Sequence, residues 1–228
     1  TPQPFWMVPQ IALYQQMNLD ITAQLSPKVN PHGLFVMGHI AKADHTLALI
    51  GADSGFWDHF KGDAEYSGGQ PDPIDRWSKR IINQIASDLQ GTAVFPSDGP
   101  PYAPFIAWAT QSGRFWQSPT GMLVHDTAGL MVSIRGAIKV PLISKQQQEV
   151  SNPCESCVER PCATACPVSA LSVDHFYDVP TCKTHLATEA GLDCMAGGCL
   201  VRQICPISQS FNRPKAQSAF HMKAFMPK

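Results

Sequence analysis

Short apolar runs and amphipathic stretches alternate along the first two thirds of the chain. Gly33–Gly38 and Thr46–Gly51 are short, apolar and bounded by glycine, which is the pattern of buried strands. A helix is predicted between Asp72, a suitable N-cap, and Gly91, a suitable stop, because apolar residues recur there every three or four positions. These residues are Ile74, Trp77, Ile81, Ile85 and Leu89.

The mixture of helix and strand continues along the chain. We predict a strand over Thr92–Pro96 and a short helix over Pro104–Gln111. Met122–His125 and Leu130–Ile134 alternate apolar and polar residues on either side of a turn, which predicts a hairpin. Strands and helices in this succession favour an α+β fold, built as an α/β sandwich.

A change in composition marks a domain boundary. Lys145–Glu149 is polar and is predicted to be a linker, and cysteine, proline and small residues dominate after it. We therefore expect an α/β domain over 1–145, where a cofactor or substrate would bind, and a second domain over 146–228.

The overall composition excludes several classes of protein. Hydrophobic residues make up 44% of the 228 and charged residues 15%, which is typical of a folded globular chain. The net charge of −1 is spread without a dense Lys/Arg run, so nothing indicates a nucleic-acid partner. No apolar run is long enough to span a membrane, and the first ten residues lack a secretory pattern. We expect a cytoplasmic protein.

The cysteines carry the strongest chemical signal. All eight fall between Cys154 and Cys205, and the first 153 residues contain none. Disulfides that stabilise a whole fold would be spread along it, and a reducing compartment disfavours them. Clustered thiols are typical of metal ligands, and Cys166 and Cys205 are each followed by proline, as the last cysteine of a ferredoxin run is.

The spacing predicts two [4Fe–4S] clusters. In two-cluster ferredoxins the last cysteine of each run ligates the other cluster. Applying this rule, the first set of ligands is Cys154, Cys157, Cys162 and Cys205. The second set is Cys182, Cys194, Cys199 and Cys166.

Zinc is the main alternative metal. Two four-cysteine zinc sites would also use all eight thiols, but zinc ribbons usually offer two CxxC pairs, and only Cys154 and Cys157 have that spacing. The protein would then be a zinc-held interaction module.

The order of parts resembles epoxyqueuosine reductase and its relatives. An α/β region is followed by a CxxC…CxxxCP run, an isolated Cys182 and a closing Cys-Pro. Upstream, Phe95–Ala109 looks like the family's strand-end D-x-x-P and following helix, and Gly113–Trp116 is similar to its Gly-x-x-Trp segment. The likeness implies a nitroreductase-like, cobalamin-binding domain and a bacterial two-cluster ferredoxin-like domain, a plan that reductive dehalogenases share.

The resemblance also implies particular site residues. Asp98 falls where the family keeps its proposed proton donor, and its alternative role is an Asx-type turn. Trp116 and Tyr102 are candidates for contact with an organic cofactor, although such aromatic residues are more often part of a core. The cofactor implied is cobalamin, with flavin as the runner-up.

Two redox hypotheses follow. In the first, a redox partner protein or a small-molecule reductant supplies electrons to the clusters, which pass them to a cofactor or substrate in the first domain. The protein would then be an oxidoreductase of the epoxyqueuosine reductase type. In the second, the protein is a ferredoxin-type electron carrier without an organic cofactor.

Overall fold

The structure is a computed structural model, which describes residues 20–175 and 177–226. The prediction about the first ten residues lies outside this part of the chain. Two compact units are present. The first comprises 1–52, 58–113 and 134–149, and the second comprises 53–57, 114–133 and 150–228. Helices and antiparallel strands both occur, so the predicted α+β character is confirmed.

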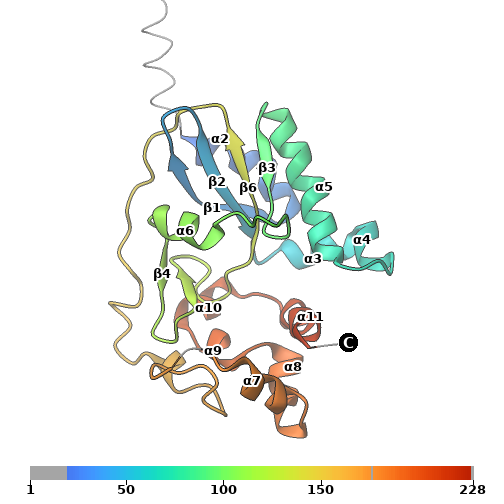
Figure 1. The fold of residues 1–228 in the computed structure, drawn as a ribbon, viewed down its shortest axis with the longest axis vertical. Helices are drawn as coiled ribbons and strands as arrows, with labels where there is room; N and C mark the ends of the chain where they lie inside the picture. Colours follow the sequence, from blue (N-terminus) through green and yellow to red (C-terminus); the bar gives the residue numbers. More distant parts are fainter. Residues whose placement is uncertain (1–19, 176, 227–228) are drawn as a thin grey trace, which may run out of the picture. The chain divides into compact units, whose positions relative to one another are not determined.

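The first unit is a four-stranded antiparallel sheet with helices packed against it (Figure 1). The strands lie in the order β1-β2-β6-β3. Their bounds are β1 (Leu34–Ala41), β2 (Thr46–Ala52), β3 (Thr92–Val94) and β6 (Ile134–Val140). The helical elements are α2 (Ile21–Val29), η1 (Asn30–His32), α3 (Phe56–Gly62, whose first two residues belong to the second unit), α4 (Ala64–Ser67), α5 (Pro73–Asp88) and α6 (Phe105–Gln111).

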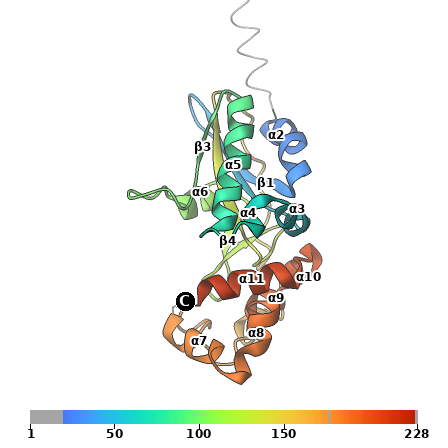
Figure 2. The same ribbon diagram turned by 90° about the vertical axis from the view of Figure 1, so that its right-hand side faces the viewer.

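Helices cover both faces of this sheet, as the burial of its interior strand β2 shows. All seven of its residues are buried, so both faces of the strand are covered. Helices α2 and α5 lie on one side of the sheet and α6 on the other (Figure 2). Helix α5 carries its apolar residues on one face, and Trp77 and Ile82 on that face are fully buried.

Local predictions for this unit are largely confirmed. Gly33–Gly38 and Thr46–Gly51 fall in paired strands, Thr92–Pro96 contains β3, and Pro104–Gln111 contains α6. Asp72 precedes α5 as predicted, but its side chain makes no capping hydrogen bond.

The segment Lys145–Glu149 is packed against the first unit. His39 of β1 is 5% exposed, and its Nε2 lies 2.9 Å from the carbonyl oxygen of Lys145. The backbone N–H of His39 donates to Oε1 of Gln147 at 3.2 Å. The prediction of a linker therefore overlooked two polar contacts with β1 that are remote in sequence, and the last of the boundaries between the two units lies at 149/150.

Replacing His39 should release this segment. We expect His39→Ala to speed trypsin cleavage after Lys145 about fivefold, because losing one buried hydrogen bond of about 1 kcal/mol raises the open population by that factor. Mass spectrometry of the digest gives the rate. His45→Ala is the control, since the only described hydrogen bond of the His45 side chain is with its exposed neighbour Asp44. Equal cleavage rates in the two variants would contradict the prediction.

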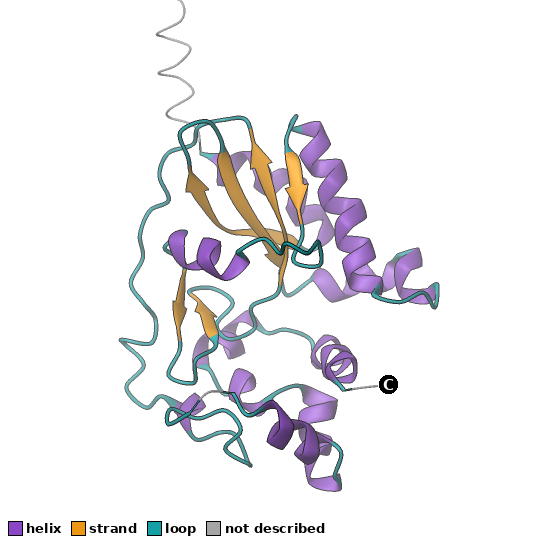
Figure 3. Ribbon diagram, viewed as in Figure 1, coloured by secondary structure: helices purple, strands orange, loops and turns teal. Residues whose placement is uncertain are grey.

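The second unit consists mostly of short helices and loops, with one small strand pair (Figure 3). The strand pair is β4 (Phe115–Gln117) with β5 (Leu123–His125). The helical elements are η2 (Pro161–Ala163), α7 (Val179–Leu186), η3 (Glu189–Gly191), α8 (Leu192–Gly197), α9 (Leu200–Gln203), α10 (Pro206–Phe211) and α11 (Lys215–Phe225). None of the helices in the described ranges is long and apolar enough to cross a membrane.

The predicted hairpin of Met122–His125 with Leu130–Ile134 is wrong. The strand β5 pairs with the preceding β4, and Leu130–Ser133 leads as irregular chain into β6. The intervening turn does form, because the buried ring of His125 accepts backbone N–H bonds at Nδ1 from two residues within it. The alternation of apolar and polar residues did not show which neighbouring segment supplies the partner strand.

Candidate metal centre

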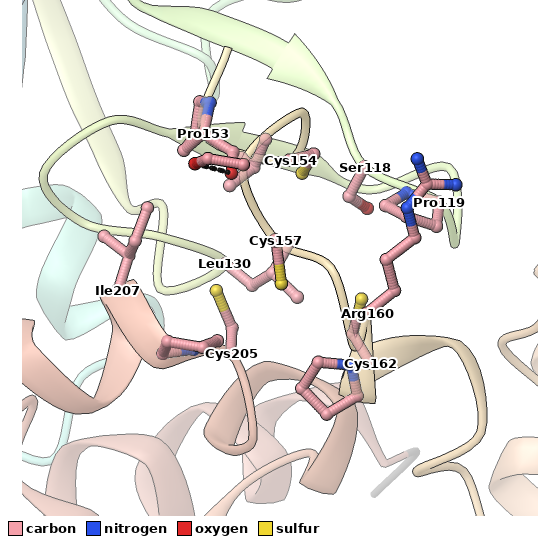
Figure 4. Close-up of a pocket in the computed structure, with 14 residues that line it drawn as sticks. Ser118, Pro119, Leu130, Pro153, Cys154, Cys157, Arg160, Cys162, Cys205 and Ile207 are labelled. Atoms are coloured by element: carbon pink, nitrogen blue, oxygen red, sulfur yellow. Dashed lines mark hydrogen bonds between the residues drawn. The ribbon is translucent and has the colours of Figure 1, made fainter.

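The first set of cysteines lines one cavity. Cys154, Cys157, Cys162 and Cys205 border a space of about 230 Å³ whose other walls are mainly apolar. Figure 4 shows their sulfur atoms around this common space, with Leu130 behind it and Arg160 at its rim. Residues up to 51 positions apart in the sequence are thus brought together at one site.

Local turns place the first three thiols. The N–H of Cys154 donates to the side-chain oxygen of Asn152 at 3.0 Å, which fixes the start of the loop. Arg160 has a φ of 42°, a left-handed conformation that turns the chain into η2. Cys162 lies in η2 and is buried. The loop therefore curls around the cavity.

The fourth thiol arrives at the start of a helix. Cys205 is the N-cap of α10, and Pro206 occupies the first turn, where a missing N–H costs nothing. Ser208 of α10 accepts the N–H of Leu130 at its Oγ, at 2.9 Å. Gly129 has a φ of 58°, and a Cβ there would lie 2.5 Å from the backbone nitrogen of Ser208. Glycine thus allows the turn of 126–129 to approach α10 closely.

The thiols of the first set affect one another's pKa. Burial raises the pKa of the Cys154 thiol, and the negative charges of the other three cysteines in the set raise it further. Burial also raises the pKa of Cys162, with added contributions from Cys205 and Cys157. Four thiolates cannot share this space unless cationic charge is placed among them.

The second set also converges. Cys182 lies in α7, Cys194 is buried in α8, and Cys199 is the N-cap of α9, while Cys166 follows η2. Burial raises the pKa of Cys194, and the charges of the three other thiols of the set raise it further. The first set thus lines one cavity, and the thiols of the second set influence one another's pKa, while the crossed pairing of the ligands stays a prediction. That they bind iron remains a prediction.

Backbone N–H groups point at the second set. Burial raises the pKa of the Cys194 and Cys199 thiols, and the backbone N–H groups of Leu200 for the first and of Val201 and Arg202 for the second lower it. The preceding Gly198 has a φ of 96°, and a Cβ there would lie 2.7 Å from Ser218. Glycine at this position therefore allows the backbone to approach Ser218 closely.

One apolar cluster connects the two sets. Its buried members are Val124, Leu130, Cys162, Leu171 and Val201. Cysteines of both sets pack against it, namely Cys154 and Cys205 of the first and Cys166 and Cys199 of the second. The sulfur sites therefore share a common hydrophobic core, which excludes water from the space beside them.

The geometry of the first set suits a cluster cofactor. A single zinc ion needs only four sulfur atoms at about 2.3 Å, whereas a cavity of about 230 Å³ has room for a larger inorganic group. Thiolates with backbone N–H donors nearby are the usual ligands of iron–sulfur clusters. Among the described residues, no group of three or more His, Cys, Asp or Glu side chains is placed to hold one metal ion.

The candidate residues taken from the resemblance lie elsewhere. Asp98 is exposed, its Oδ2 accepts the N–H of Phe95 at 3.2 Å, and its Oδ1 lies 2.7 Å from Nζ of Lys79. Tyr102 is 69% exposed in the same unit. Trp116, in the second unit, packs against the apolar cluster. The structure does not gather these three around the cysteine-lined cavity.

Two residues near the second set were not found from the sequence. Burial raises the pKa of Tyr177, with a further contribution from Cys182, and the charge of Arg202 lowers the pKa of Cys199, which burial raises. Arg202 is three residues after Cys199, the N-cap of α9. Residues three apart lie on the same side of a helix, so the sequence could have indicated that Arg202 lies near Cys199. Nothing local in the sequence marks Tyr177.

Comparison with known proteins adds no relative. No protein-family model matches this chain, and no curated protein matches it. The assignment of the site therefore depends on its own residues.

The contacts of Asp98 support a stabilising role that mutation can measure. We expect Asp98→Asn and Lys79→Met each to lower the free energy of unfolding by less than about 1 kcal/mol, because the ion pair is about half exposed. The double variant should cost little more than either single variant, since both remove the same pair. Urea unfolding gives the three values. Additive losses would contradict a direct interaction.

Proposed function

We propose that this chain is an iron–sulfur redox protein that holds two [4Fe–4S] clusters. The first set of cysteines would ligate one cluster and the second set the other. When bound, the clusters supply one-electron transfer chemistry. One observation carries the proposal. The cysteines gather in two sets of four, and Cys205 in the first set and Cys166 in the second each come from the sequence run of the opposite set.

The surroundings of the thiols support this role. The shared apolar cluster keeps the space between the sets dry, and a low local dielectric strengthens every hydrogen bond and charge that acts on the sulfur atoms. The first set also borders a second, wide depression of about 1200 Å³ through Cys154 and Arg160. An electron donor or acceptor therefore has a surface on which to approach one of the two sites.

The nitroreductase-like fold and the organic cofactor are the less supported parts of the proposal. The four-stranded sheet with helices on both faces is compatible with such a domain. Asp98 and Tyr102 are exposed, and neither lines the two cavities described above. These residues do not form a cradle for cobalamin or flavin, so we derive no step through either.

An electron carrier is the second candidate function. The contacts of Asp98 favour it, because its Oδ1 lies 2.7 Å from Nζ of Lys79 and its Oδ2 accepts the N–H of Phe95, so both carboxylate oxygens are engaged within the first unit. In this case the first unit would serve to dock a redox partner. Turnover of a substrate by the loaded wild type, lost in Asp98→Asn, would instead favour the reductase.

Metal analysis tests the main proposal. Protein purified without oxygen should contain about eight iron atoms and as many acid-labile sulfides per chain, with visible absorption that dithionite bleaches. Cys157→Ser and Cys199→Ser should each lose about half of the iron or more, because each removes a ligand from a different set. Colourless protein that contains zinc would establish the interaction module instead.

A matched control separates loss of a ligand from disturbance of the loop. Val158 is next to Cys157 and is 93% exposed, so Val158→Ser introduces the same side chain without touching a thiol. We expect this variant to retain its full iron content. Unchanged iron in both cysteine variants would refute the ligand assignment.

A further inference from the structure

The first set of cysteines borders a wide depression on the second unit. The depression has a volume of about 1200 Å³, and Cys154 lines both it and the smaller cavity of the first set. Its walls are the turn between β4 and β5, the loop that carries Cys154, and residues 171–175 with Tyr177, all of which belong to the second unit. A molecule seated in the depression would therefore contact a ligand of the first set.

The lining of the depression suits contact with another protein. Buried Leu171 and partly buried Met122 pack in the apolar cluster, while Val173 and Tyr177 are 56% and 42% exposed. Sites for small molecules typically measure about 300 to 1000 Å³ and enclose their ligand. The centre of a protein–protein contact is apolar, is enriched in aromatic residues, and has a polar rim. The depression matches the second description more closely than the first.

Negative charge is concentrated around this depression. The segment 150–178 holds four carboxylates against one arginine, Arg160, although the net charge of the whole chain is only −1. Glu155 and Asp174 line the depression, Glu159 is on the same loop as Glu155, and all three are exposed. None of the hydrogen bonds and ion pairs between described residues involves these three carboxylates, whereas the fourth caps α7. Such a rim is complementary to a basic surface.

We propose that this depression docks a redox protein whose contact face is basic, and that electrons pass between this partner and the cluster of the first set. The inference rests on the proposed function. When the chain is the donor, its first cluster loses one electron and the redox centre of the partner gains it, with no transfer of a proton or a group. The carboxylates attract the partner, and the apolar residues form the contact once it has arrived.

Cytochrome c is a suitable probe, because lysines surround its haem edge and succinylation reverses their charge. Anaerobic protein with its full iron content is reduced with dithionite, freed of excess reductant, and mixed with ferric cytochrome c in a stopped-flow spectrometer. We expect the second-order rate constant of haem reduction to fall as salt is added, because salt screens the attraction. At low salt, succinylated cytochrome c should react more slowly than the unmodified protein.

A triple variant locates the docking surface. Glu155→Gln with Glu159→Gln and Asp174→Asn should lower the rate constant with cytochrome c about eightfold at low salt, since one charge at about 10 Å in water changes the encounter about twofold. At high salt the variant and wild type should react at the same rate. With succinylated cytochrome c the variant should react faster than wild type. Iron analysis checks that both clusters are retained.

The cysteine variants show which cluster exchanges electrons with the probe. Cys199→Ser leaves the first set intact and should keep the fast, salt-dependent reduction of cytochrome c. Cys157→Ser removes a ligand from the first set and should lose this fast phase. A fast phase that survives in Cys157→Ser and is absent from Cys199→Ser would place docking at the second set and overturn the inference.

A second triple variant is the matched control. Asp44→Asn with Asp58→Asn and Asp88→Asn removes the same net charge from exposed carboxylates of the first unit, none of which lines the depression. It should change the rate constant less than about twofold, the effect of one charge at about 10 Å. Equal effects of the two triple variants, or no effect of either, would overturn this inference alone. Wild type without iron and sulfide would overturn the proposed function and this inference with it.

Discussion

The second unit depends on one constraint, which is the packing of cysteines of both sets against a small apolar cluster. Val124, Leu130 and Val201 are nearly inaccessible, and cysteines of both sets border them. Burial makes each thiolate costly, and neighbouring thiolates make it more so, as the raised pKa values of Cys154 and Cys194 show. A bound cationic group would offset both costs, so cofactor binding and the folding of this unit are expected to be coupled.

The same constraint accounts for the irregular backbone. Short helices begin at a cysteine or next to one, as α9 and α10 do, because a helix start directs N–H groups toward its N-cap. Left-handed residues such as Gly198 and Arg160 turn the chain between thiols. A long helix or a wide sheet would separate the ligands. The unit therefore has little regular secondary structure, and its short helices and turns let cysteines that are distant in sequence lie near one another.

The first unit follows simpler rules, and most of it was predictable. The apolar runs of β1 and β2 and the helical spacing in α5 are local signals of burial. The wrong predictions concerned which segments contact each other. The alternating residues of Met122–His125 fitted a strand, but its partner was the preceding β4. The polar composition of Lys145–Glu149 suited a linker, yet His39 holds it through backbone and side-chain contacts.

The sequence by itself determined which residues are the candidate ligands. The eight cysteines are clustered in the sequence. Short loops between the cysteines of one run allow their thiols to reach a common centre. Only the tertiary structure showed the roles of the distant residues. It pairs Asp98 with Lys79 at a turn, and it brings the guanidinium of Arg202 to the carbonyl oxygen of Leu130. Such contacts depend on how separate helices and loops pack, and no local pattern of side chains encodes that packing.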